Sequence, residues 1–208
     1  MIISFIGMSG VGKSTWSSKL EKEEGFKRYS CDDLIEKELA PELKQLGYKG
    51  INDVSHWLGQ PDDKRYKKNS RRYLELEAKS LAYILSEIKK SNNGNIVVDT
   101  TGSVVYLPSK LLAALKKQTK VIYLKTPKTI IKEKIKQYVT DPKPVIWGDR
   151  YRSLRGEKKA ETLKRCYPKL LKYRTKLYER LGDISIDYYT QRKKGFGAHN
   201  LLTLITKD

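Results

Sequence analysis

One stretch near the start of the chain constrains the fold more than any other. Residues 7–14 read GMSGVGKS and fit the pattern GxxxxGK[ST] in full. An apolar, β-rich run at residues 2–6 precedes them, and a helical pattern to about residue 24 follows. A glycine-rich turn between a strand and a helix aims backbone N–H groups and the positive helix end at phosphate oxygens. The sequence therefore predicts a phosphate-binding loop for a purine nucleoside triphosphate with Mg²⁺.

The positions of this loop have separate expected roles. Lys13 should reach the β- and γ-phosphates of the nucleotide, and Ser14 should ligate Mg²⁺. We expect ATP to be bound by Gly7, Ser9, Gly10, Val11, Gly12, Lys13, Ser14 and Thr15.

Short apolar runs alternate with helical patterns along the rest of the chain. Strands are expected at residues 2–6, 26–30, 96–99, 121–124 and 184–188. Helices are expected at residues 13–24, 32–39, 51–58, 64–90, 108–117, 127–138 and 198–205. A further helix should end near residue 181 after an interruption near Pro168, and residues 41–50 are interpreted as a connector.

This alternation predicts an α/β fold with helices on both faces of a parallel sheet. We expect the three-layer α/β/α arrangement of P-loop NTPases, with five parallel strands, similar to nucleoside monophosphate kinases and with a helical lid. The length favours a single domain over residues 1–208. Ligands of such folds bind beyond the carboxyl ends of the strands, where the motifs of this chain fall.

The charge balance points to anionic partners. Lys+Arg number 43 against 24 Asp+Glu, a formal net charge of +19. Such a field attracts nucleic acid or small phosphorylated and carboxylated metabolites. The lysines are scattered, as at Lys132, Lys134 and Lys136, so we interpret them as a solvated surface. Binding to nucleic acid is kept as the less favoured alternative.

Cysteine usage and hydropathy predict the compartment. Cys31 and Cys166 are far apart in the sequence and form no CxxC pair, which excludes a disulfide framework and a cysteine-rich zinc site. No apolar run reaches the roughly 18 residues that a membrane span needs. The first residues lack the form of a secretory signal, because polar residues follow the apolar run at once. We expect a cytoplasmic protein that does not enter membranes.

Other nucleotide-binding classes fit less well. The chain has no guanine-reading NKxD motif, and it is too short for a helicase or a transporter ATPase. Asp99 ends the apolar run IVVD, a position where other nucleotide kinases carry an aspartate that orients Mg²⁺ through water. The pattern favours a small-molecule kinase, with Ser14 and Asp99 at the metal.

Motifs over nearly the whole chain resemble the shikimate kinase family. Residues 32–36, DDLIE, match the end of the family's DxDxxIE. This match places Asp32 on the aspartate that binds the acceptor hydroxyls near the reacting oxygen. The family's first aspartate is replaced by Ser30.

Two arginines follow from the same resemblance. Residues 51–75 resemble IxxIFxxxGExxFRxxE with an insert at residues 61–71, which implies Arg72, with Arg71 next, as an arginine that holds the substrate carboxylate. Residues 170–178 resemble LLxxRxPLY, which implies Arg174 as a second one.

The acceptor pocket and the lid are implied more loosely. Thr101 and Gly102 stand where the family has a triple glycine beside the substrate. Residues 143–146, KPVI, stand where it has the lid motif RPLL. Arg150, Arg152 and Arg155 follow, and one of these is expected to supply the cation over the transferring phosphate, with Arg150 and Arg152 as the leading candidates. We therefore expect a substrate-binding region at 31–75 and a lid region at 140–168.

Together these residues predict a phosphotransferase. Lys13, Mg²⁺ and a lid arginine would offset phosphate charge, Asp32 would accept the proton of the acceptor hydroxyl, and Arg72 and Arg174 would hold an acidic acceptor. Shikimate is the leading acceptor, and the alternatives are a nucleoside or nucleotide, a gluconate-like sugar acid and a polynucleotide end. A nucleic-acid-binding protein that uses ATP as a switch is the alternative of another class. We expect a monomer or a weak dimer.

Overall fold

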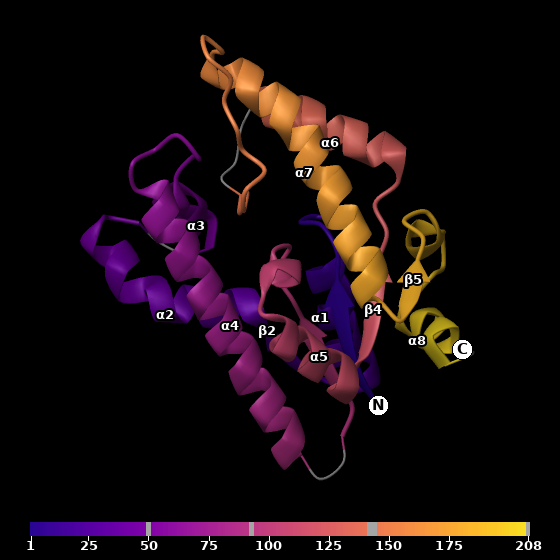
Figure 1. The fold of residues 1–208 in the computed structure, drawn as a ribbon. Helices are drawn as coiled ribbons and strands as arrows, with labels where there is room; N and C mark the ends of the chain where they lie inside the picture. The colour runs from indigo at the N-terminus through magenta and orange to yellow at the C-terminus, as the bar shows by residue number, and fades with distance from the viewer. Residues whose placement is uncertain (49–50, 92–93, 141–144, 207–208) are drawn as a thin grey trace.

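A sheet of five parallel strands forms the centre of the molecule (Figure 1). The computed structural model describes residues 1–48, 51–91, 94–140 and 145–206, without the side chains of residues 51 and 52. The strands lie in the order β2-β3-β1-β4-β5. Their bounds are β1 Ile2–Ile6, β2 Lys27–Ser30, β3 Ile96–Asp99, β4 Lys120–Leu124 and β5 Ile184–Ile186. All five predicted strands are confirmed.

The helices follow the predicted order with two corrections. Their bounds are α1 Lys13–Glu24, α2 Cys31–Gln45, α3 Ile51–Leu58, α4 Tyr66–Lys90, α5 Ser109–Gln118, α6 Lys128–Thr140, α7 Lys159–Leu181 and α8 Ala198–Thr206, with 3₁₀ turns η1 Val104–Tyr106 and η2 Thr190–Arg192. The predicted connector after Pro41 is wrong, because α2 continues to Gln45. The predicted interruption near Pro168 is also wrong, because α7 runs through it.

Tertiary packing explains why both prolines are tolerated. Leu39 and Leu43 lie on either side of Pro41 and are both buried, so continuing α2 keeps one apolar stripe against the core. Tyr167 and Leu170 flank Pro168 in the same way. Burial of these side chains outweighs the hydrogen bond that a proline removes, which costs about 3 kcal/mol.

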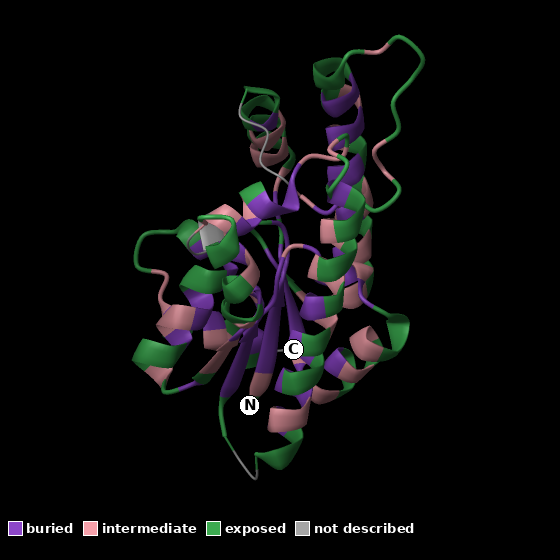
Figure 2. Cartoon of the chain, turned by 90° about the vertical axis from the view of Figure 1, so that its left-hand side faces the viewer, coloured by how far each residue is buried: buried purple, intermediate pink, exposed green. Residues whose placement is uncertain are grey.

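The sheet separates two apolar clusters. Ile3 and Phe5 of β1 face α1 and α8, where they pack with Trp16, Leu20 and Leu201. The next side chain, Ile6, belongs to the cluster on the other face, formed mainly with α2, α4, α5 and α7. The three central strands, β1, β3 and β4, are almost wholly buried between these layers, as Figure 2 shows. Within the described residues, no helix is both long and apolar enough to cross a membrane.

The strand register decides where the site forms. Phe5 and Ser30 both lie opposite Asp99, so β1, β2 and β3 end at the same edge of the sheet. The segments that follow these strands therefore meet there: the glycine-rich loop, the first turn of α2 and residues 100–103. Helices α6 and α7 pack side by side and extend beyond this edge (Figure 1).

Candidate active site

The glycine-rich loop has the backbone that its sequence predicts. Gly7, Gly10 and Gly12 have φ values of 144°, 72° and 115°. A Cβ atom on Gly7 would lie 2.8 Å from the carbonyl oxygen of Leu124, so that position admits only glycine. The loop leads directly into α1, whose N-terminus adds its partial positive charge. This geometry is a cradle for phosphate.

Lys13 lies inside the loop. Its side chain is buried, and Nζ donates hydrogen bonds to the carbonyl oxygens of Gly7 at 3.1 Å and Met8 at 3.2 Å. Burial lowers the pKa of this ammonium, and the charges of Asp99 and Asp32 oppose that shift. The ammonium therefore lies within the field of both carboxylates. Ser14 and Thr15, the next two residues, are exposed beside the loop.

Asp99 is the last residue of β3 and lies at the same edge of the sheet as the loop. The residue is 3% exposed. Its Oδ2 accepts hydrogen bonds from Ser17 Oγ at 3.3 Å and Arg28 Nη2 at 3.4 Å, whereas the buried Oδ1 has no hydrogen-bond partner within the described structure. A buried carboxylate oxygen without a donor is costly unless a ligand or water meets it. The oxygen therefore fits a carboxylate that would meet a water molecule on a magnesium ion, and Ser14 is the hydroxyl that could bind such an ion directly.

Among the residues that the structure describes, no larger metal cluster competes with this assignment. The described residues contain no group of three or more His, Cys, Asp or Glu side chains able to hold a metal ion. Mg²⁺ in nucleotide sites is held mostly by phosphate oxygens and water with few protein ligands. A hydroxyl and one carboxylate are a donor set of that kind.

Asp32 lies in the first turn of α2. Ser30 caps this helix, and its Oγ accepts a hydrogen bond from the backbone N–H of Asp33 at 3.1 Å. Asp32 Oδ1 accepts a hydrogen bond from the hydroxyl of Tyr73 at 3.4 Å. Burial raises the pKa of Asp32, and the charge of Lys13 opposes the shift. Ser30 stands at the position of the first aspartate of the shikimate kinase motif, and here its hydroxyl caps the N-terminus of α2.

Arg174 reaches the same region from α7. It is 7% exposed, and it donates from Nε to the Tyr106 hydroxyl at 3.3 Å and from Nη2 to the Ile146 carbonyl oxygen at 2.5 Å. A Cβ on Gly102 would lie 3.4 Å from the N atom of Ser9 and 3.9 Å from Arg174 Nη1. Gly102 therefore separates the arginine from the phosphate loop by one thin layer of backbone.

Thr101 faces a buried carboxylate that our sequence reasoning missed. The hydroxyl of Thr101 donates to Glu77 Oε1, and Ser103 Oγ donates to Glu77 Oε2 at 2.7 Å. Glu77 is fully buried, and burial raises its pKa to about 7. A signal existed in the sequence, because Glu77 falls between Leu74 and Leu81 on the apolar stripe of α4. A carboxylate three or four residues from these leucines lies on the apolar face of the helix, so it is buried when that face packs against the core.

Arg72 does not join the other predicted residues. Its Nε lies 3.5 Å from Glu42 Oε1 of α2, and both side chains are 44% exposed. Arg71 pairs with Glu75 at 3.0 Å on the surface of the same helix. The α4 residue that contacts Asp32 is Tyr73, one position further along. The structure thus brings together Lys13, Asp32, Asp99 and Arg174, with Arg72 outside the group.

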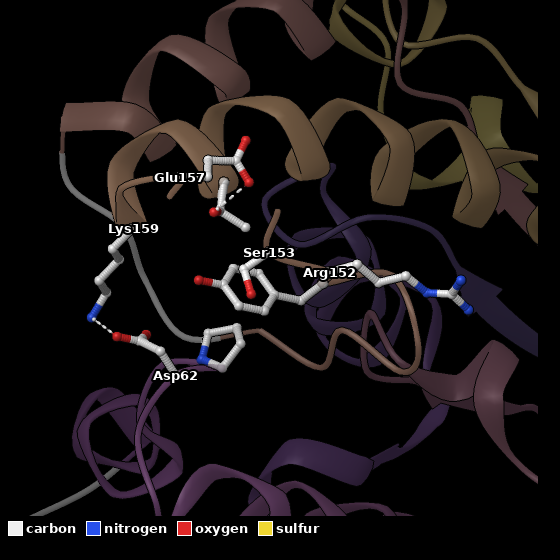
Figure 3. A pocket seen from close by; sticks show the side chains of 8 residues that line it. Asp62, Arg152, Ser153, Glu157 and Lys159 are labelled. Atoms are coloured by element: carbon white, nitrogen blue, oxygen red, sulfur yellow. Dashed lines mark hydrogen bonds and ion pairs between the residues drawn. The ribbon is translucent and has the colours of Figure 1, made fainter. Parts of the chain in front are cut away.

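The predicted lid arginines contact residues other than those of the loop. Arg150 stacks on the Tyr173 ring at 3.9 Å, with its Nε 2.9 Å from Asp149. Arg152 is 79% exposed, and its guanidinium extends away from Asp62 and Lys159 (Figure 3). Of the lid motif at residues 143–146, positions 143 and 144 fall outside the described residues.

Two other cations contact the loop instead. Lys134 of α6 donates from Nζ to the Ser9 carbonyl oxygen at 2.7 Å, and Arg192 of η2 donates from Nη2 to that of Val11 at 3.4 Å. Burial lowers the pKa of Lys134, and the charge of Arg192 adds to the shift. We had interpreted Lys134 as part of the solvated surface. Its sequence neighbourhood, three lysines at alternate positions, does not distinguish it from Lys132 or Lys136.

The α3–α4 loop and the segment before α7 enclose a pocket of about 590 Å³. The pocket is lined by residues 61–62 on one side and residues between 151 and 162 on the other, and the ion pair of Lys159 with Asp62 at 3.0 Å crosses it (Figure 3). Nearby, the Tyr66 hydroxyl donates to the Val145 carbonyl oxygen and accepts from the Trp147 N–H, both at 2.8 Å. The insert and the predicted lid are therefore in direct contact.

Comparison with known proteins agrees with this geometry. A family model described as an AAA domain matches residues 2–145. The chain belongs to this AAA-domain family. The matched segment holds the phosphate loop, Asp32, Glu77 and Asp99, whereas Arg174 lies beyond it. No curated protein matches the sequence.

Solved structures relate this AAA-domain protein to a kinase fold. The shikimate kinase from Aquifex aeolicus vf5 superposes with a TM-score of 0.58 at 19% identity, over 98% of this chain and 96% of that one. The enzyme from Bacteroides thetaiotaomicron gives 0.58 at 14% identity, with coverages of 97% and 94%. The Acinetobacter baumannii enzyme, in complex with shikimate, gives 0.53 at 20% identity, with coverages of 97% and 88%. The predicted P-loop kinase fold is confirmed.

Proposed function

We propose that this protein is an ATP-dependent kinase that transfers the γ-phosphate of Mg·ATP to a hydroxyl of a small acidic acceptor. One observation carries the proposal: Lys13, Asp32 and Asp99 meet at the carboxyl edge of the sheet, and the two carboxylates oppose the effect of burial on the lysine. On this proposal, a phosphate-binding cation, a proton acceptor and a metal-orienting carboxylate act within one electrostatic field.

The nucleotide would be held by the loop from Gly7 to Thr15. Its backbone N–H groups and Lys13 would bind the phosphates, and Lys134 is placed to cover them from α6. Ser14 would ligate Mg²⁺, and Asp99 Oδ1 would orient the ion through a water molecule. When bound, Mg²⁺ neutralises charge on the phosphate oxygens.

Asp32 would orient the acceptor hydroxyl and accept its proton. The raised pKa makes this carboxylate a better base, and the Tyr73 hydroxyl holds its other side. Arg174 would bind the acid group of the acceptor through Nη1, because Nε and Nη2 already have partners. We assign the acid group to Arg174 alone, since Arg72 is paired with Glu42.

Different segments of the single domain would thus bind the acceptor and cover the site. We propose residues 31–75 as the acceptor-binding region and 140–168 as a lid that excludes water, with ATP and Mg²⁺ required. Shikimate is the first acceptor to test, because the structural neighbours named above are shikimate kinases.

The test is a coupled ADP-release assay with Mg·ATP and a panel of acceptors. The panel holds shikimate, quinate, gluconate, nucleosides, nucleoside monophosphates and an oligonucleotide with a 5′-hydroxyl. We expect turnover with an acidic acceptor. Asp32→Asn should lower kcat by orders of magnitude while ATP still binds, and Asp33→Asn is the matched control, because Asp33 is the exposed neighbour. A normal kcat for Asp32→Asn, or no acceptor-dependent ADP release, would overturn the proposal.

A further inference from the structure

A second cleft lies on the outer side of the acceptor-binding region. It has a volume of about 910 Å³ and is formed by the end of α2, by α3 and by the first turns of α4, which pack on one another (Figure 1). The cations that line it are Lys64, Arg65, Lys67, Lys68, Arg71 and Arg72. All six are exposed.

The cations of this cleft are mostly unneutralised. Its two carboxylates are already engaged, Glu42 with Arg72 at 3.5 Å and Glu75 with Arg71 at 3.0 Å. In the part of the chain that the structure describes, the remaining four cations form no ion pair. Lys67 and Lys68 lie in the first turn of α4, and Lys64 and Arg65 directly precede the helix, so the four cations lie close together along the chain. The protein therefore holds like charges together at a cost that a bound polyanion would remove.

The chemistry of the phosphoryl-transfer site does not use this cleft. The side of α4 that faces the site carries Tyr66, Tyr73 and Glu77. Tyr66 hydrogen-bonds to the lid segment and Tyr73 to Asp32, and Glu77 accepts hydrogen bonds from the loop that holds Thr101 and Ser103. The cations of the cleft lie on the other side of the helix, against α2.

We propose that this basic cleft binds the phosphodiester backbone of a single-stranded nucleic acid. Several exposed cations along one groove match the repeated negative charge of such a strand. The aromatic residue of the cleft, Trp57, is buried, so it offers no stacking surface for bases. Binding is therefore expected to depend on salt and to be insensitive to base sequence.

The experiment measures fluorescence anisotropy of a labelled single-stranded oligonucleotide of mixed sequence over a series of salt concentrations. The test variant combines Lys64→Gln, Arg65→Gln, Lys67→Gln and Lys68→Gln. The control variant removes the same charge elsewhere, through Lys22→Gln, Lys89→Gln, Lys110→Gln and Lys117→Gln, which are all exposed. Thermal melting checks that both variants are folded.

The cleft variant should lose at least about tenfold in affinity, and the slope of log K against log salt should fall in magnitude by about 0.7 for each phosphate contact removed. The control should keep the wild-type slope. Equal losses in both variants would show a diffuse effect of the overall charge and overturn the proposal, as would a wild-type protein that does not bind. Lys68→Glu and Lys89→Glu provide a second pair, in which only the first should weaken binding.

Discussion

The buried carboxylate Glu77 makes a sharp prediction about stability and pH. Both of its oxygens accept hydrogen bonds from hydroxyl groups, those of Thr101 and Ser103, and the side chain is fully buried. Among charged groups, Asp32 raises its pKa further and Arg174 lowers it. The perturbation is Glu77→Gln, which keeps the size of the side chain and removes its titration.

The magnitude follows from the pKa of Glu77, which burial raises from 4.5 to about 7. The folded protein keeps the proton up to about that pH, whereas the unfolded chain releases it near pH 4.5. The stabilisation from this group is therefore complete below pH 4.5 and is lost as the pH rises to 7. At about 1.4 kcal/mol per pKa unit, the loss amounts to about 3 kcal/mol.

The assay is urea unfolding of both proteins between pH 4.5 and pH 8. The free energy of unfolding of the wild type, minus that of Glu77→Gln, should fall by about 3 kcal/mol across this range, because other carboxylates titrate equally in both. Glu75→Gln is the matched control on the exposed side of the same helix, and its difference from the wild type should stay nearly constant. A constant difference for Glu77→Gln would refute the reasoning.

Three further substitutions test the site and its lid. Lys13→Ala should abolish most ADP release, because it removes the buried ammonium that contacts the loop from inside; turnover near the wild-type level would contradict its role. Arg174→Ala should mainly raise the KM for the acceptor and leave the KM for ATP nearly unchanged, and the opposite pattern would reassign it to the nucleotide. Tyr66→Phe removes two hydrogen bonds to the lid segment and should cost about 1–3 kcal/mol in urea unfolding, so an unchanged midpoint would show that these contacts are dispensable.

The strands and most helices could be predicted because their signals are local. A buried parallel strand is a short apolar run between turn residues, and all five runs lie in the sheet. The errors came at Pro41 and Pro168, where a local helix-breaking signal was overridden by burial of Leu39, Leu43 and Tyr167. Burial of that kind is a property of the packed molecule.

The candidate site divides in the same way. Asp99 could be predicted because it ends the apolar run of β3, and Asp32 because residues 32–36 resemble a family motif. The register of β2 and β3 places both residues at one edge of the sheet. Arg72 was misplaced because adjacent positions on a helix point about 100° apart, and the insert before it leaves the phase undetermined. Tyr73 therefore takes the position beside Asp32.

The sequence by itself determined the phosphate loop, the order of the strands along the chain and the two acidic residues at their ends. Each depends on a few neighbouring residues whose backbone preferences are strong. Only the tertiary structure decided which further cations contact the loop: Lys134 and Arg192 donate hydrogen bonds to its carbonyl oxygens, whereas Arg150 and Arg152 pair with Asp149. Which residues of distant helices meet depends on how those helices pack on the sheet. In a sequence rich in lysine, no local pattern distinguishes the lysine that this packing brings to the loop.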